Sequence, residues 1–143
     1  VGFVLPFDRL LDMTRTVPAP KTKAPAVSAA DYFAAKLAYE MTPWTLKALL
    51  DKGAKDYFIL DVRTPEDFKS GCLPTAVNIP LADLTGKFAT LPKNKTIVTY
   101  CANITCALAP KAALELAQKG FKVMELFGGI AEWTANGFPV EKA

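Results

Sequence analysis

Apolar positions along the chain follow two kinds of spacing that alternate with each other. Two nearly continuous apolar runs, Tyr57–Val62 and Thr96–Tyr100, are typical of central parallel strands covered on both faces. Between such runs, apolar residues recur at helical spacing. Strands alternating with helices predict a three-layer α/β domain with a mostly parallel central sheet flanked by helices. Shorter strands are expected at 39–41, 75–78 and 121–126, and helices at about 29–38, 43–53, 65–71, 80–88, 109–118 and 129–137.

Capping signals mark where several of these helices begin and end. Ser28-Ala29-Ala30-Asp31 resembles a capping box, and Thr42 stands before a proline at the first helical position, Pro43. Gly53 and Gly120 follow the last helical residues of two segments, where glycine favours a helix end. We therefore expect one domain over residues 28–143, which includes a leading helix.

Residues 1–27 have a different pattern. Phe3 to Met13 has apolar residues at helical spacing, and Thr14 to Val27 contains three prolines among lysines and alanines, as in an extended linker. We expect an N-terminal tail and a Pro/Lys/Ala-rich linker. Two interpretations of the tail stay open: a docked or disordered extension, or a contact with a partner or a membrane surface.

Composition limits the class of protein. Of 143 residues, 51% are hydrophobic and 22% charged, so a packed core is expected. The net charge of +3 comes with scattered lysines, which does not favour a nucleic-acid partner. No apolar run approaches the roughly 20 residues of a transmembrane segment, and no intact signal peptide is visible. We expect a cytoplasmic protein, with a periplasmic location after removal of an upstream signal left open.

The chain has no histidine and three cysteines, which restricts the available chemistry. Without histidine there is no Ser-His-Asp triad and no Cys-His pair, and three thiols alone do not complete a four-ligand zinc site. We therefore expect no metal and no cofactor. A nucleophile in this chain must be activated by its electrostatic surroundings, which favours cysteine, since a helix terminus can lower the pKa of a thiol.

Cys101 is the candidate nucleophile. It follows the apolar run that ends at Tyr100, and an alanine-rich helix begins about eight residues later. A thiol at the end of a strand and beneath the start of a helix faces backbone N–H groups that favour an anion. The competing interpretation is an inert buried thiol. The N–H groups expected to form the cradle belong to Ala102, Asn103, Ile104, Thr105 and Ala107.

Several motifs in a fixed order resemble the rhodanese-like sulfurtransferases from about Met41 to Val140. They are Asp61-Val62-Arg63, Gly71–Pro80, the strand end Tyr100-Cys101, Gly120-Phe121, and Leu126–Trp133 with Gly137–Val140. Ala34–Glu40 with Pro43-Trp44 also resembles a bacterial single-domain subgroup that has a helix before the domain. The resemblance implies transfer of sulfane sulfur by ping-pong catalysis, with Cys101 as the persulfide carrier.

The chain departs from the usual family pattern in its active loop. The loop after Cys101 has neither Gly nor Arg, and it resembles a two-cysteine variant, Cys-x4-Cys-x2-Ser/Ala, met by Cys101, Cys106 and Ala109. Cys106 has three interpretations: a resolving thiol, a second acceptor of sulfur, or a small residue that fills the loop. Cys72 and Thr75 replace the family's usual His and Gly, and Cys72 is expected to be structural.

The expected substrates follow from the same resemblance. The donor is thiosulfate, polysulfide or a persulfide, and the acceptor is a thiol, cyanide or a protein sulfur acceptor. Ala102 to Leu108 contains no cation, so Arg63 and Lys111 are the candidates for contact with a charged donor. Arg63 has a second interpretation, a structural ion pair with Asp61 or Glu66. A neutral loop suits polysulfide or a protein persulfide at least as well as thiosulfate.

Other functions compete with sulfur transfer. The missing Gly and Arg also fit a non-catalytic rhodanese-like binding or regulatory module, and two cysteines in one loop fit a thiol redox sensor that forms a Cys101–Cys106 bridge. A phosphatase or arsenate reductase is disfavoured, because Ala107 stands where such a loop needs arginine to stabilise an oxyanion.

Overall fold

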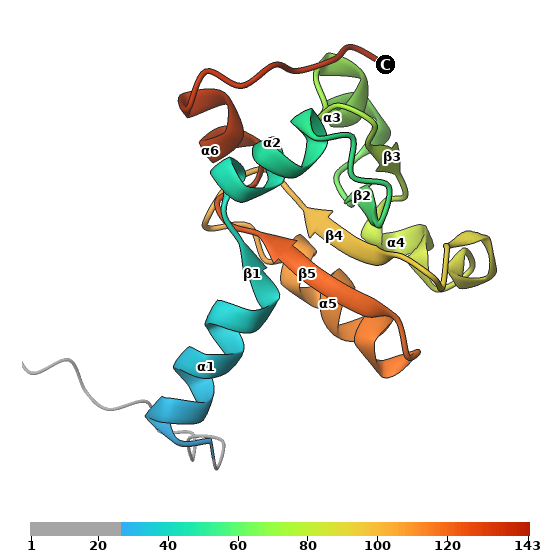
Figure 1. The fold of residues 1–143 in the computed structure, drawn as a ribbon. Helices are drawn as coiled ribbons and strands as arrows, with labels where there is room; N and C mark the ends of the chain where they lie inside the picture. Colours follow the sequence, from blue (N-terminus) through green and yellow to red (C-terminus); the bar gives the residue numbers. More distant parts are fainter. Residues whose placement is uncertain (1–26) are drawn as a thin grey trace, which may run out of the picture.

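The computed structural model describes residues 27–143 (Figure 1). The expected tail, with its short helix at Phe3–Met13, lies outside these residues. The elements are, in chain order, α1 (Ala29–Tyr39), β1 (Glu40–Met41), α2 (Pro43–Asp51), β2 (Tyr57–Asp61), α3 (Pro65–Ser70), β3 (Val77–Asn78), α4 (Leu81–Leu84), the 3-10 turn η3 (Phe88–Thr90), β4 (Thr96–Tyr100), α5 (Leu108–Gln118), β5 (Lys122–Leu126) and α6 (Gly129–Ala135).

The five strands form one parallel sheet in the order β1-β5-β4-β2-β3. β4 is the middle strand, and its register runs from Tyr57 opposite Thr96 to Asp61 opposite Tyr100 on the β2 side. β1 pairs only at Glu40 and Met41, with the end of β5. The expected α/β domain with a parallel sheet between helices is confirmed, and its central strand ends directly before Cys101.

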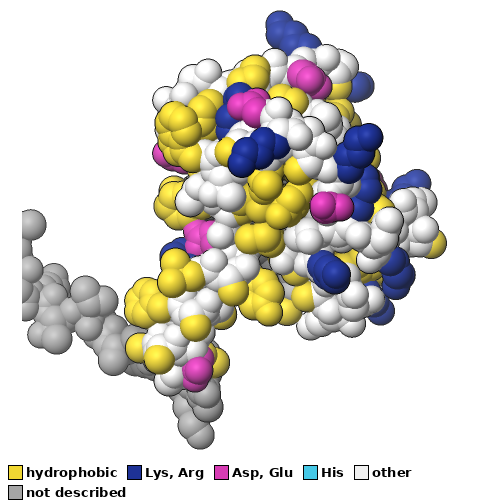
Figure 2. Space-filling model, in the orientation of Figure 1, with side chains coloured by type: hydrophobic (Ala, Val, Ile, Leu, Met, Phe, Trp, Pro, Cys, Tyr) yellow, Lys and Arg dark blue, Asp and Glu magenta, His cyan; other side chains and the backbone are white. Residues whose placement is uncertain are grey.

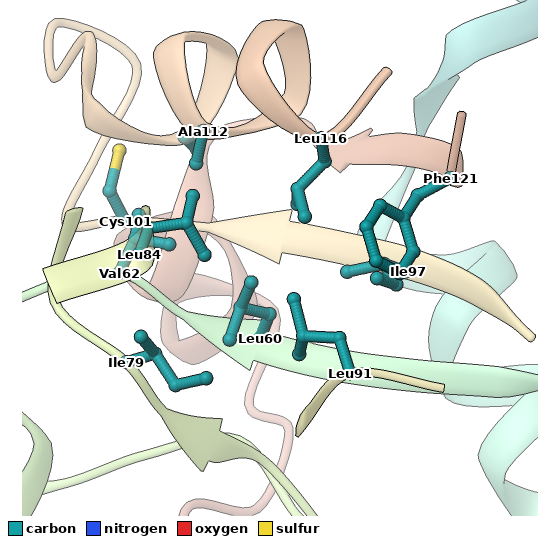
Figure 3. Packing of buried hydrophobic residues seen from close by; sticks show 11 residues of the cluster. Leu60, Val62, Ile79, Leu84, Leu91, Ile97, Cys101, Ala112, Leu116 and Phe121 are labelled. Carbon is teal, nitrogen blue, oxygen red and sulfur yellow. The ribbon is translucent and has the colours of Figure 1, made fainter. Parts of the chain in front are cut away.

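Alternate residues of the central strand enter two separate cores. Ile97 and Cys101 belong to the cluster beneath α5, which Figure 3 shows, while Val98 and Tyr100 belong to the cluster on the opposite face, with Trp133 of α6. Since side chains alternate between the faces of a strand, a strand buried on both faces is apolar throughout. The same alternation turns the Cys101 side chain toward α5.

The predicted helix starts are present. The hydroxyl of Ser28 accepts a hydrogen bond from the Asp31 N–H at 3.1 Å, and Thr42 caps α2 through the Thr45 N–H at 3.2 Å. One prediction was wrong: residues 80–88 do not form a single helix. α4 stops after one turn, because the chain turns at Gly86, whose N–H donates to the Asp83 carbonyl, and only then enters η3.

Helix α1 projects from the body of the domain (Figure 1) and buries none of its residues. Its large apolar side chains are exposed, among them Leu37 at 83% and Phe33 at 59%, and Figure 2 shows hydrophobic atoms over this helix. Within residues 27–143, no helix is long and apolar enough to cross a membrane.

Candidate active site

The site is built at the carboxyl end of β4. Cys101 is 2% exposed, and its sulfur turns away from the apolar cluster toward the loop before α5 (Figure 3). On the same strand, the Thr99 hydroxyl donates to the Ala109 carbonyl of α5 at 3.1 Å. This bond joins the strand, two residues before the thiol, to the first turn of α5.

An Asn103 turn shapes the loop between Cys101 and α5. Its side-chain oxygen accepts from the N–H of Thr105 at 3.0 Å and from the Thr105 hydroxyl at 2.7 Å, and its carbonyl accepts from the Cys106 N–H at 3.1 Å. An Asx turn of this kind is a local alternative to helix. The turn brings Cys106 back to Cys101.

The start of α6 holds the loop from the other side. The N–H groups of Ile130 and Ala131 donate to the carbonyls of Cys101 and Ala102, each at 3.0 Å. This approach requires Gly129, which has φ +60°, since a Cβ there would lie 2.3 Å from the Cys101 carbonyl oxygen. Only glycine combines that backbone conformation with so close a contact.

The two loop cysteines are joined by a hydrogen bond. The Cys101 thiol donates to the backbone carbonyl oxygen of Cys106 at 3.3 Å. Backbone N–H groups of Ala102 and Ala109 face Cys101, while those of Ala102 and Leu108 face Cys106. Of the predicted cradle, Ala102 therefore points at sulfur and Thr105 donates to Asn103 instead; Leu108 and Ala109, at the start of α5, supply the further donors.

The pair divides its acidity unevenly. Burial, and then the hydrogen bond that Cys101 donates to Cys106, raise the pKa of Cys101 to about 11. Burial also acts to raise the pKa of Cys106, but the hydrogen bonds from Cys101, Leu108 and Ala102 and the charge of Arg63 outweigh it and lower that pKa. The lowered pKa therefore belongs to Cys106 and the raised one to Cys101, which the helix-terminus argument alone did not predict.

Arg63 is held by a buried ion pair. Its guanidinium donates to Asp61 at 2.6 Å from Nη2 and at 3.1 Å from Nε, and Nη2 also donates to the Gly71 carbonyl at 2.7 Å. Arg63 is 7% exposed and Asp61 is fully buried. The contacts of Arg63 with Asp61 and Gly71 are those of a structural ion pair. A contact of Arg63 with substrate stays a prediction.

Cys101 opens on a cavity of about 480 Å³ between α1, β5 and the loop. Asn103 and Ile104 of the loop line it, but Lys111 and Cys106 do not. Its remaining lining comes from α1, from the first turns of α5 and from β5 through Gly129: Tyr32, Ala35, Lys36, Tyr39, Glu40, Pro110, Ala113, Val123, Met124, Glu125, Leu126, Phe127, Gly128 and Gly129.

The charged groups of the cavity are one lysine and two glutamates. Lys36 forms an ion pair with Glu40 and lies 5.5 Å above the ring of Phe127. Burial, and then the charge of Glu40, raise the pKa of Glu125. Lys36 is thus already neutralised, so the cavity offers a dianion little electrostatic attraction.

Cys72 is separate from this pair. It is 3% exposed and forms a two-residue bridge with Glu141, whose carbonyl accepts from the Cys72 N–H at 2.8 Å. Burial raises the pKa of its thiol. This placement fits the expected structural role. Within residues 27–143, no three cysteine, aspartate or glutamate side chains gather as a metal site.

Comparison with known proteins identifies the family. A family model described as Rhodanese-like domain matches residues 42–136. The chain belongs to this family. The matched region contains strands β2 to β5 and both sides of the Cys101 loop, while α1 and β1 precede it.

Individual relatives carry different names. A protein named sulfurtransferase from Allochromatium vinosum is 31% identical over 87 residues, which cover 60% of this chain and 79% of that protein. The HTH-type transcriptional regulator Rv0324 of Mycobacterium tuberculosis is 36% identical over 62% of this chain, but the match covers only 39% of its length. The solved structure of the BH2092 protein from Bacillus halodurans has a TM-score of 0.71 at 39% identity and covers 79% of this chain and 83% of that one.

The sequence alone did not single out three residues of the site. Gly129 was recognised as part of a turn, but its contact with the Cys101 carbonyl depends on the packing of α6. Lys36 and Glu40 were placed on or after the leading helix, with no sign that this helix walls the cavity. Their helical spacing of four predicts the ion pair between them, which was the available signal.

Proposed function

We propose that the protein is a sulfurtransferase in which Cys101 accepts a sulfane sulfur as a persulfide and passes it to a thiophilic acceptor. The observation that carries this proposal is the position of the thiol. It stands at the end of the central strand, faces the N–H groups of Ala102 and Ala109, and opens on a cavity. The sulfurtransferase-named relative that this chain matches over most of its length supports the same activity.

The arrangement supplies what each half-reaction needs. Cys101 gives up its proton to Cys106, whose thiol has the lowered pKa and whose carbonyl oxygen lies 3.3 Å from the Cys101 sulfur, so no imidazole is required. The Cys101 thiolate attacks the donor's sulfane sulfur, and the rest of the donor leaves with the electron pair of the broken bond. Backbone N–H groups then hold the anionic outer sulfur until an acceptor thiolate or cyanide attacks it and Cys101 departs as thiolate.

The donor whose charge the cavity suits best is an organic persulfide. The cavity walls are mainly apolar, and the one lysine that lines them is paired with Glu40. Thiosulfate and inorganic polysulfide are dianions, so both would meet Glu40 and Glu125 as well as Lys36. The acceptor is a thiol of a small molecule or of a protein that reaches the cavity past α1.

Trapping the persulfide tests the proposal. Reduced protein is mixed with inorganic polysulfide, quenched within seconds by an alkylating reagent, and mapped by mass spectrometry. We expect the mass of one additional sulfur atom on the Cys101 peptide, absent from Cys101→Ser. The matched control is Cys72→Ser, which changes a thiol outside the site and should load like wild type. No additional sulfur on Cys101 from polysulfide, thiosulfate or an organic persulfide would contradict the proposal and leave the binding module as the alternative.

A further inference from the structure

The second thiol of the loop lies beside the first. Cys106 is half-buried and packs at the edge of the cluster beneath α5, in a loop whose neighbours Ile104, Thr105 and Ala107 are exposed. The Cys101 thiol donates to its carbonyl oxygen at 3.3 Å, which holds the two cysteines together. The N–H groups of Ala102 and Leu108 favour the thiolate of Cys106 and help to lower its pKa. Cys72, by contrast, is buried and bonded to the chain end.

We propose that Cys106 is a resolving thiol, which attacks the inner sulfur of the Cys101 persulfide and releases hydrogen sulfide as the product. This inference rests on the proposed function, because it begins from the persulfide on Cys101. It assigns a terminal product and a need for a dithiol reductant that the family membership does not imply.

The step balances in atoms, charge and electrons. The persulfide anion on Cys101 and the thiol of Cys106 become a Cys101–Cys106 disulfide and HS⁻. The bond between the inner and outer sulfurs breaks, and the outer sulfur keeps its electron pair and takes the proton of Cys106. The two cysteine sulfurs are oxidised together by two electrons, and the outer sulfur is reduced to sulfide. An external dithiol of the thioredoxin class then reduces the disulfide and restores the pair.

The geometry distinguishes attack on the inner sulfur from relay of the outer one. Cys101 lines the cavity and Cys106 does not. We therefore place the outer sulfur of the persulfide on the cavity side. The inner sulfur of the persulfide is the Cys101 sulfur itself. It therefore stays beside Cys106, whose carbonyl oxygen lies 3.3 Å from it. Cys106 therefore attacks the inner sulfur, and this attack forms the Cys101–Cys106 disulfide.

The loop can close without disturbing the strand. The carbonyls of Cys101 and Ala102 are fixed by Ile130 and Ala131 of α6, so the strand end stays in place. Asn103 to Cys106 is held by bonds within the turn itself. Movement of Cys106 toward Cys101 therefore displaces mainly an exposed turn, with Cys106 itself at the edge of the cluster beneath α5.

The test follows the persulfide after loading. Wild type, Cys106→Ser and Cys72→Ser receive one equivalent of inorganic polysulfide without oxygen, and Cys106→Ser is loaded at alkaline pH so that Cys101 ionises without its partner. All are returned to neutral pH without reductant. We expect wild type and Cys72→Ser to release one sulfide per chain and to form the Cys101–Cys106 disulfide. In Cys106→Ser the persulfide should persist about tenfold longer or more, because the thiol acts within the same loop.

Each other outcome contradicts either the resolving role of Cys106 or the proposed function. A persulfide that forms on Cys101 and lasts as long in wild type as in Cys106→Ser contradicts the resolving role but leaves the proposed function standing. Additional sulfur found on Cys106 contradicts it in favour of a relay. Absence of any persulfide on Cys101 in both proteins contradicts the proposed function itself. A dithiol added after sulfide release should restore a second round in wild type, and failure to do so also counts against the resolving role.

Discussion

At the scale of single residues, the ion pair of Asp61 and Arg63 joins the sheet to the segment that follows α3. Asp61 ends β2 without solvent exposure, and Arg63 reaches from it to the Gly71 carbonyl. The ring of Tyr100 lies 5.6 Å from the guanidinium carbon, and its hydroxyl accepts from the Leu73 N–H at 3.1 Å. A buried charge of this kind is tolerated only while its partner and hydrogen bonds are in place.

Removal of the arginine should therefore cost stability. Arg63→Ala leaves Asp61 as an unpaired buried carboxylate, and we expect a loss of about 3–5 kcal/mol in the free energy of unfolding, measured in urea. Lys111→Ala, which removes an exposed cation of α5, is the matched control and should leave stability unchanged. If Arg63→Ala unfolds like wild type while its KM for thiosulfate rises, the side chain contacts substrate instead.

The sequence predicted which residues carry chemistry better than it predicted their charge states. The sequence predicted a thiol at a strand end at Cys101. It also predicted two roles for Arg63, contact with a charged donor and a structural ion pair with Asp61 or Glu66. The acidity of Cys106 was not predicted, because it depends on a hydrogen bond across a six-residue loop and on N–H groups whose direction the Asn103 turn sets.

At the scale of elements, the site is a junction of β4, its loop, α5 and α6. The loop is fixed to α6 by backbone bonds at Cys101 and Ala102 and to α5 through Thr99 and Ala109. Side chains contribute little to the α6 contact, whose closeness depends on Gly129. The position of the nucleophile therefore depends on a residue without a functional group.

Replacement of that glycine should show the dependence. In Gly129→Ala the new Cβ meets the Cys101 carbonyl at 2.3 Å, so the strand end or α6 must shift. The control is Gly137→Ala, which has φ +72° and no atom within 4 Å of the new Cβ. We expect the control to cost about 1–2 kcal/mol from its backbone alone, and Gly129→Ala to cost at least about 2 kcal/mol more, with slower persulfide loading. Equal unfolding free energies would contradict the role of the contact.

Most elements were predictable because their signals are local. Caps at Ser28 and Thr42 and the apolar runs of β2 and β4 act within a few residues, so the elements they predict are present. The prediction of one helix over residues 80–88 was wrong, because three apolar residues at helical spacing did not outweigh the turn at Gly86. The position of α1 over the cavity was not predictable, since its apolar residues predict a helix but none of them is buried against the domain.

At the scale of the whole molecule, the charge of the chain and the charge of its cavity differ in sign. The chain has a net charge of +3, but the charged residues that line the cavity are Lys36, Glu40 and Glu125. Arg63 is occupied by Asp61, and Lys111 does not line the cavity. A donor is therefore selected by the local groups, since distant lysines are screened by salt.

Donor charge should consequently control the rate. We expect kcat/KM to be lower for thiosulfate than for an uncharged dialkyl trisulfide, and Glu40→Gln to raise the thiosulfate value alone, by about fivefold if one charge near the donor changes its barrier by about 1 kcal/mol. Asp51→Asn, which removes an exposed carboxylate of α2 outside the cavity, is the control.

Because the pKa of Glu125 is raised, that group is neutralised at a higher pH than an ordinary carboxyl. The ratio of thiosulfate to trisulfide turnover should therefore increase as pH falls, while the need for ionised thiol cancels from the ratio. A ratio that stays constant with pH and is unchanged in Glu40→Gln would show that the cavity charges do not select the donor.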